Sequence, residues 1–260
     1  MKNYILTFAS KKFKNALTIQ KIVSEYLGYA HIAFSENHLP SFFKSSMSRL
    51  RGYGYWCWKP YLISKTLDVL PENSTFWWVD SAIIPLRKAQ NLPQNFSYIY
   101  LQKNIYSEPR KWCKPITELM LFDADMFENF LCHGQIPDAS VIGFKVCPQT
   151  RKLVSDWLEL CQVMSNIDDS LDQNIAVSPR FKDHRHDQSL LGFVAYKSKL
   201  DFLPSLTQYS EYNPQFYHHR LHCASLKLKI RVLIGYVYWL FISNAKINTK
   251  SVKLPKSLLY

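Results

Sequence analysis

Glycine is scarce in this chain, with only seven among 260 residues. Two of the seven, Gly52 and Gly54, stand one residue apart in the stretch from Arg51 to Pro60, which reads RGYGYWCWKP. Glycine lets the backbone turn tightly or come close to a ligand, which residues with side chains resist. Four aromatics and two cations share the stretch, so it is either a ligand contact or a buried aromatic cluster under a loop.

Cysteine pairs with metal-binding spacing are absent as well. The six cysteines are widely scattered and show no C-x-x-C spacing, which indicates free thiols in a reducing compartment. The N-terminus lacks the long apolar stretch of a signal peptide, so we expect the bulk of the protein to be cytoplasmic.

Acidic residues are absent after Glu211, although eight lysines and arginines follow, and the net charge of the chain is +12. The apolar run from Val232 to Ile242 is too short to span a bilayer, but its flanking cations, Tyr and Trp suit a segment in the headgroup region. A buried C-terminal helix with solvated lysines is the alternative. We expect one domain at residues 1–220 and a basic amphipathic tail at residues 221–260 that binds an anionic membrane surface.

The apolar pattern near the N-terminus predicts a βαβ unit. A β-rich run at Tyr4–Phe8, helical spacing over Ala16–Tyr26 and a second run at Ala30–Phe34 favour a parallel sheet. Ser10 is the expected cap of the helix. Ligands bind beyond the C-terminal ends of strands in such sheets, which puts Thr7 at the rim of a possible site.

The remaining elements are predicted from the same kinds of pattern. We expect helices at Leu39–Leu50, from Pro60 onward, at Pro115–Leu131 with a break near Asp123, at Pro148–Met164 and from His184 to Val194. We expect strands at Ser74–Val79, Ser97–Leu101, Ala139–Val146 and Leu200–Leu203.

The strand Ser74–Val79 ends abruptly at Asp80-Ser81. A carboxylate at the end of a buried strand is costly unless it meets a cation, a donor or water. Asp80 therefore either serves a ligand or caps the next turn. A literal Asp-x-Asp triplet exists at Asp123–Asp125, but it lies in a helical pattern and no clear strand presents it, so we treat it as a decoy.

The stretch from His184 to Ser189 holds four titratable residues in a row, followed by an amide and a hydroxyl. Two histidines two apart suit a metal, but no further ligand cluster is evident nearby. The alternative is a polar helix N-terminus at which Asp187 stabilises the first turn. A helix N-terminus also suits a phosphate.

Together these stretches resemble bacterial GT-A-type glycosyltransferases that build cell-surface polysaccharides, capsule or lipopolysaccharide. The resemblance rests on the blocks Arg51–Pro60, Trp77–Asp80, Arg110–Trp112, Gln135–Ile136 and Arg185–Ser189, in that order. It implies an α/β, Rossmann-like fold with a central mixed sheet flanked by helices. It also implies transfer of a hexose from a nucleotide-diphospho-sugar, preferably a UDP-sugar, to a glycan or lipid-linked acceptor. The enzyme would act in the cytoplasm, attached peripherally to the inner membrane, without a nucleic acid partner.

The resemblance further implies roles for single residues. Gln188 would lie beside the anomeric carbon of the donor, and Asp187 would hold a donor hydroxyl, as in retaining enzymes. Residues from several stretches would bind the nucleotide-sugar: Thr7, Arg51, Tyr55, Trp56, Lys59, Asp80, Ser81, Arg185 and His186. Trp112 and Gln135 would bind the acceptor.

This chain departs from the Asp-x-Asp of that family, because it reads Asp80-Ser81-Ala82. A divalent cation, Mn²⁺ or Mg²⁺, would then be held by Asp80, the diphosphate and a histidine such as His218 or His219. Without a cation, the diphosphate would have to be neutralised by protein cations alone: Arg51, Lys59 and Arg185. Two other interpretations stay open, a catalytically inactive relative and a basic nucleic-acid-binding protein.

Overall fold

The computed structural model describes residues 3–41, 43, 48–93, 95–208 and 214–219. The basic tail expected at residues 221–260 lies outside the described residues, as does part of the helix expected at Leu39–Leu50. Residues 48–50 form a turn and a bend, so that helix prediction is wrong at its C-terminal end.

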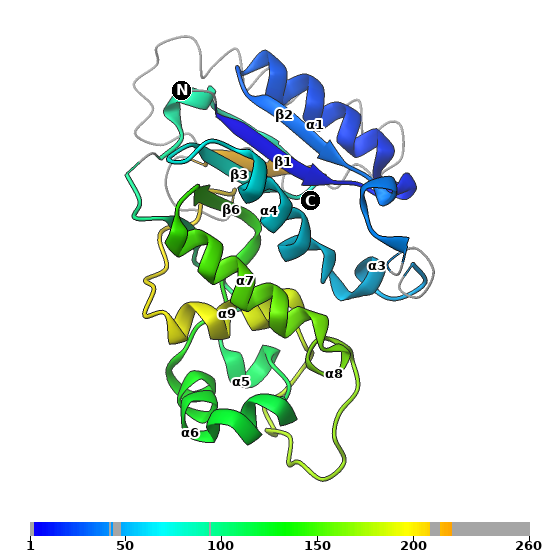
Figure 1. Ribbon diagram of the computed structural model, residues 1–260, viewed down its shortest axis with the longest axis vertical. Coiled ribbons are helices and arrows are strands. Elements are labelled where there is room, and N and C mark those ends of the chain that lie inside the picture. The colour runs from blue at the N-terminus through cyan, green and yellow to red at the C-terminus, as the bar shows by residue number, and fades with distance from the viewer. Residues whose placement is uncertain (1–2, 42, 44–47, 94, 209–213, 220–260) are drawn as a thin grey trace.

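A five-stranded mixed sheet forms one half of the molecule, in the upper part of Figure 1. Its strands lie in the order β2-β1-β3-β6-β5. The bounds are β1 Tyr4–Phe8, β2 Ala30–Phe34, β3 Thr75–Val79, β5 Ile99–Gln102 and β6 Asp138–Lys145. β1 is parallel to β2 and β3, whereas β6 is antiparallel to β3 and β5. The predicted α/β fold with a central mixed sheet is confirmed.

The N-terminal βαβ unit also forms as predicted. Helix α1 (Lys14–Tyr26) joins β1 to β2 and packs on one face of the sheet (Figure 1). The prediction for Ser10 is wrong in its detail. Ser10 precedes a short 3-10 turn, η1 (Lys11–Phe13), and its side chain makes no capping hydrogen bond.

Two strands of three residues each, β4 (Ile83–Pro85) and β7 (Phe216–His218), pair antiparallel in a second small sheet that the sequence did not predict. The strand predicted at Leu200–Leu203 is wrong. Only Leu203 forms an isolated bridge, opposite Gln102. Pro204 follows it and has no N–H with which to extend a ladder, so the pairing ends after one residue.

The helices below the sheet are stacked in series (Figure 1). α4 (Trp58–Val69) packs on α7 (Pro148–Gln162), and α7 packs on α9 (Asp187–Lys197). Three further helices lie beyond: α5 (Pro109–Trp112), α6 (Thr117–His133) and α8 (Met164–Ile167). Among the described residues, no helix is long and apolar enough to cross a membrane.

Helix α6 breaks where the sequence predicts an interruption. Asp123 has non-helical dihedral angles, φ −159° and ψ 75°. Its carboxylate accepts the N–H of Met126 at 3.1 Å, as a helix cap does. The Asp123–Asp125 triplet therefore has a local structural role within α6.

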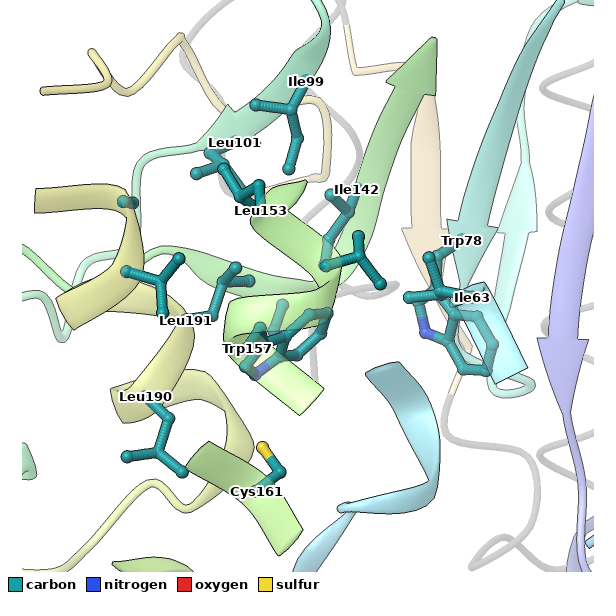
Figure 2. Packing of buried hydrophobic residues seen from close by; sticks show 14 of the residues in the cluster. Ile63, Trp78, Ile99, Leu101, Ile142, Leu153, Trp157, Cys161, Leu190 and Leu191 are labelled. Atoms are coloured by element: carbon teal, nitrogen blue, oxygen red, sulfur yellow. The ribbon is translucent and has the colours of Figure 1, made fainter. Parts of the chain in front are cut away.

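The larger core lies between the sheet and helices α4, α7 and α9 (Figure 2). Its centre is made of large buried side chains from each layer: Trp78 of β3, Ile142 of β6, Ile63 of α4, Trp157 of α7 and Leu191 of α9. A second core lies on the other sheet face and includes Ile5 and Trp77 together with side chains of α1. Because strand residues alternate between faces, Asp80 continues the face of Trp78, toward α4 and α9.

Candidate active site

The stretch from Arg51 to Pro60 forms a left-handed turn followed by a helix. Five consecutive residues, Gly52 to Trp56, have φ between 55° and 95°, and the first four of them are assigned as α3 (Gly52–Tyr55). A Cβ on Gly52 would lie 2.4 Å from the ring of Trp56, and the Gly52 carbonyl accepts the indole N–H of Trp58 at 3.0 Å. The glycines therefore serve a tight turn, and α4 begins at Trp58, before the predicted Pro60.

This turn places Lys59 in the interior, between the carboxylates of Asp80 and Asp187. Lys59 is 3% exposed, and its Nζ donates to the carbonyl of Ala139 at 3.0 Å. The same Nζ lies 3.4 Å from Asp80 Oδ1 and 3.5 Å from Asp187 Oδ2. Burial by itself would lower the pKa of Lys59, but the two carboxylates raise it above the ordinary value. Lys59 is therefore a permanent cation shared by two acids.

Asp187, the first residue of α9, is the more buried of the two acids at 4% exposed. Its carbonyl accepts the indole N–H of Trp157 at 2.8 Å, which fixes its backbone. Its Oδ2 makes no hydrogen bond with the described residues. Burial raises the pKa of Asp187 to about 7; the charge of Asp80 adds to this effect, and Lys59 opposes it. A buried carboxyl group with a pKa near neutrality is typical of a functional site.

Asp80 faces solvent more than Asp187 does, since 36% of its side chain is exposed. Its Oδ1 accepts the indole N–H of Trp78 at 2.9 Å and also lies beside Lys59. The expectation that this strand-end carboxylate meets a donor or a cation is confirmed by both contacts. The exposed part of the carboxylate remains accessible to a ligand.

Gln20 holds the turn that presents Asp80, and sequence reasoning missed it. It is fully buried in α1, and its Nε2 donates to the carbonyls of Asp80 at 2.9 Å and Ile83 at 2.8 Å. Its Oε1 lies 3.1 Å from Nε2 of His31 in β2. Burial lowers the pKa of His31 to about 4, so the ring is neutral and its Nε2–H donates to Gln20. The one available signal was a polar residue on the apolar face of the predicted helix.

His186 joins the aromatic turn to the start of α9. Its ring centroid lies 4.9 Å from that of Tyr55 and 5.6 Å from that of Trp56. Its Nδ1 lies 2.7 Å from the carbonyl of Ile167, and its φ of 50° is a strained backbone conformation for a residue other than glycine. Burial lowers the pKa of His186. Nδ1 carries the proton, because the carbonyl of Ile167 can only accept a hydrogen bond. Three predicted site residues, Tyr55, Trp56 and His186, therefore lie in contact in one aromatic cluster.

The predicted arginines differ in their partners. Arg51 forks onto both carboxylate oxygens of Asp183 at 3.2 and 2.9 Å. Arg185 instead lies over Trp112, with its guanidinium carbon 4.2 Å from the ring centroid. Gln188 is half-buried in the first turn of α9, and its N–H donates to the carbonyl of Arg185 at 3.0 Å. Trp112, Arg185 and Gln188 thus lie together at the N-terminus of α9.

Three predicted residues lie apart from Lys59 and its two acids or are inaccessible. Thr7 is fully buried and, two positions from Ile5, shares the face covered by α1. Ser81 is buried in the turn after β3. Gln135 lines a cavity of about 270 Å³ together with Tyr196, which lies nine residues and about 14 Å along α9 from Asp187. The roles assigned to these three residues stay predictions.

The surroundings of Asp80 fit a cation that takes further ligands from a substrate. Among the residues the structure describes, no group of three or more His, Cys, Asp and Glu side chains is placed to hold a metal. Strand β7, however, puts His218 opposite Ile83 and brings its Nε2 to 3.5 Å from Ser140 Oγ. The carbonyl of Ser140 accepts the N–H of Asp80 at 2.9 Å, so the His218 side chain and the Asp80 backbone contact the same residue. Magnesium sites often combine one or two protein ligands with substrate phosphates.

The fold resembles solved glycosyltransferases, although no protein-family model matches the chain and no curated protein matches it in sequence. An active-site mutant of LgtC gives a TM-score of 0.50 at 9% identity, with 95% of this chain and 98% of that chain covered. The galactosyltransferase LgtC in complex with donor and acceptor sugar analogues gives 0.49 at 9% identity and the same coverage of 95% and 98%. The glycosyltransferase GlyE of Streptococcus pneumoniae TIGR4 gives 0.48 at 12% identity, covering 97% of this chain and 66% of that one. The first comparison shows the fold alone: the chain has the GT-A architecture.

Proposed function

We propose that this protein moves a hexose from a nucleotide-diphospho-sugar, preferably a UDP-sugar, to a glycan or lipid-linked acceptor. The observation that supports this best is the cluster of Asp80, Lys59 and Asp187 within a glycosyltransferase fold. The cluster lies at the C-terminal end of β3, and ligands of α/β sheets bind at that edge.

Asp187 and Gln188 are the catalytic residues of this proposal. With a pKa of about 7, the Asp187 carboxyl group is able either to donate a hydrogen bond to a hydroxyl of the donor sugar or to accept one from it. The carboxamide oxygen of Gln188 would lie beside the anomeric carbon and stabilise the positive charge that develops there. This is electrostatic stabilisation of an oxocarbenium-like sugar, with retention at the anomeric carbon.

In this proposal Lys59 does not contact the diphosphate. It is buried, and its charge is already shared by two carboxylates, so it holds Asp80 and Asp187 in place. A divalent cation, Mn²⁺ or Mg²⁺, would be held by Asp80 and His218 together with the diphosphate. Such a cation, when bound, neutralises charge on the leaving nucleoside diphosphate. The clustered rings of Tyr55, Trp56 and His186 would form a wall for the nucleotide-sugar.

The proposal includes a cellular setting, in which the enzyme works on cell-surface polysaccharide at the cytoplasmic face of the inner membrane. Residues 221–260 contain seven cations and no acidic residue, which supports their attachment to anionic lipid.

Release of UDP from a panel of UDP-hexoses tests the proposal. We expect turnover of at least one donor, stimulated by Mn²⁺ or Mg²⁺, and a loss of roughly a hundredfold or more in Gln188→Ala and Asp80→Asn. Asp156→Asn is the control, because this carboxylate lies on α7 and pairs with Lys152 of the same helix. The proposal is wrong if no donor binds or is turned over, or if a donor is turned over but both variants behave like the control.

A further inference from the structure

Most cations near the start of α9 are already paired with carboxylates. Ion pairs join Lys59 to Asp80 and Asp187, Arg51 to Asp183, Lys114 to Asp168, Arg110 to Glu128, and both Lys111 and Arg180 to Glu108. Arg185 and Lys182 differ from them. Within the described part of the chain, neither has a carboxylate at ion-pair distance.

These two cations converge on one aromatic ring. The guanidinium carbon of Arg185 lies 4.2 Å from the centroid of Trp112, and Lys182 Nζ lies 5.9 Å from it. Tyr106 completes the group, with its ring centroid 5.5 Å from that of Trp112 and 6.0 Å from the Arg185 guanidinium. We call these four side chains the Trp112 cluster.

The Trp112 cluster is fixed by the backbone beneath it. The N–H of Lys182 donates to the carbonyl of Lys111 at 2.9 Å, and the N–H of Arg185 donates to the carbonyl of Trp112 at 2.9 Å. The hydroxyl of Ser189 donates to that second carbonyl as well, at 2.7 Å. The segment that carries both cations is therefore held in register along α5.

The chemistry of the cluster suits an acidic sugar. A guanidinium stacked on an aromatic ring keeps its N–H edge available, and that edge matches a carboxylate or a phosphate. Tyr106 is 52% exposed and offers a flat face to a sugar ring. A ligand with a sugar ring and an adjacent negative charge would use both features.

The position of the cluster favours the acceptor over the donor. Arg185 stands two residues before Asp187, so the backbone between these two residues spans at most about 7 Å. The cluster itself belongs to α5 and the segment before α9, on the far side of α9 from the sheet that carries Asp80 (Figure 1). On the basis of the proposed function, we infer that the acceptor is a sugar bearing a carboxylate or phosphate, recognised by Arg185 and Lys182 over Trp112. Arg185 then serves the acceptor, and not the nucleotide-sugar as predicted from the sequence.

Binding of simple probes tests this inference without turnover. We would measure calorimetrically the affinities of p-nitrophenyl β-glucuronide, glucose 6-phosphate and the neutral p-nitrophenyl β-glucoside. We expect at least one acidic probe to bind about tenfold or more tightly than the glucoside, since hydrogen bonds to charged groups are stronger than those between neutral groups. Arg185→Met and Lys182→Met should each reduce that preference about tenfold, while the affinity for UDP stays unchanged.

Lys111→Met is the matched control, because Lys111 lies on the same short helix but is paired with Glu108 at 2.6 Å. It should leave the preference intact. The inference is overturned if no acidic probe binds more tightly than the glucoside, or if Arg185→Met weakens UDP instead. An acidic preference without turnover of any UDP-sugar would contradict the proposed function and leave the site standing. Turnover with neutral acceptors only would contradict the inferred acidic acceptor and leave the proposed function standing.

Discussion

Two lysines are buried among the residues that the structure describes, and they lie in very different electrostatic surroundings. Lys114 is 2% exposed, and its Nζ donates to Asp168 Oδ1 at 2.7 Å and to the carbonyl of Ser170 at 2.8 Å. Lys59 is 3% exposed and has two carboxylates at 3.4 and 3.5 Å. The pair of Lys114 and Asp168 is compact and balanced in charge. The group around Lys59 instead has two carboxylates for one ammonium, and both lie at longer distances.

The pKa values of Asp168 and Asp187 shift in opposite directions. Burial tends to raise the pKa of Asp168, but the hydrogen bonds from Lys114 and Ser170 outweigh it and hold that pKa below its usual value. The same effect of burial prevails at Asp187, whose pKa rises to about 7. A buried ion pair is therefore no sign of function by itself. An unbalanced pair with an unsatisfied acid is the more informative feature.

Removing each lysine should give the largest difference. Lys59→Met leaves Asp187 buried and close to Asp80 without a cation, so we expect a loss of about 3–5 kcal/mol in the free energy of unfolding. Lys114→Met should lose less, about 1–3 kcal/mol, because Asp168 keeps 22% of its side chain in solvent and its hydrogen bond from Ser170. Urea unfolding of the two variants measures both values. Equal losses would contradict the comparison.

The two acids should also give opposite pH dependences of stability. Asp187 binds its proton more tightly when folded, so its contribution to stability declines as pH rises from about 4 toward 7. The slope is at most about 1.4 kcal/mol per pH unit for one group. Asp168 has a lowered pKa, so its contribution is present above its unfolded pKa and disappears as pH falls.

Unfolding of Asp187→Asn and Asp168→Asn across pH 3–8 separates these contributions. Relative to the wild type, Asp187→Asn should become progressively more stable as pH rises toward 7. Asp168→Asn should instead differ least from the wild type at the lowest pH. Parallel curves for the two variants would contradict the opposite pKa shifts of Asp187 and Asp168.

Replacing Gln20 should have a smaller effect than replacing Lys59, confined to the turn that carries Asp80. Gln20→Leu leaves the carbonyls of Asp80 and Ile83 without their buried donor, and we expect a loss of roughly 1–3 kcal/mol. Gln162→Leu, at the exposed end of α7, is the matched control and should change stability by less than about 0.5 kcal/mol. Donor turnover should fall in Gln20→Leu, because the turn that carries Asp80 loses its support. Unchanged turnover would assign Gln20 a purely structural role.

The periodic elements of this fold could be predicted from the sequence. β1, α1, β2 and α7 have apolar residues at clear periods, and their predicted spans agree closely with the structure. β4 and β7 could not be found, since each has three residues and they pair across more than a hundred residues of chain. Pattern reasoning detects local periods, whereas this pairing depends on the tertiary fold.

For the candidate site, the sequence indicated individual residues better than the contacts between them. The positions of Asp80 and Asp187 at a strand end and a helix start followed from local patterns. The contact of Lys59 with Asp187 joins residues far apart in sequence, and a positive charge alone does not reveal which acid it meets. For the same reason, Lys59 and Arg51 were predicted to face a phosphate, but in the structure both meet carboxylates.

The left-handed turn at Gly52–Trp56 has a consequence for how freely this stretch can vary. A left-handed residue other than glycine costs roughly 1–2 kcal/mol, and Tyr53, Tyr55 and Trp56 all adopt that hand. An excised peptide of this sequence has nothing to offset that cost, so its shape is supplied by the surrounding fold. At Gly52, any L side chain would collide with Trp56 before a ligand is considered. On grounds of handedness alone, Gly52 and Gly54 therefore resist substitution, whereas Tyr53, Tyr55 and Trp56 already carry that cost and would lose it on replacement by glycine.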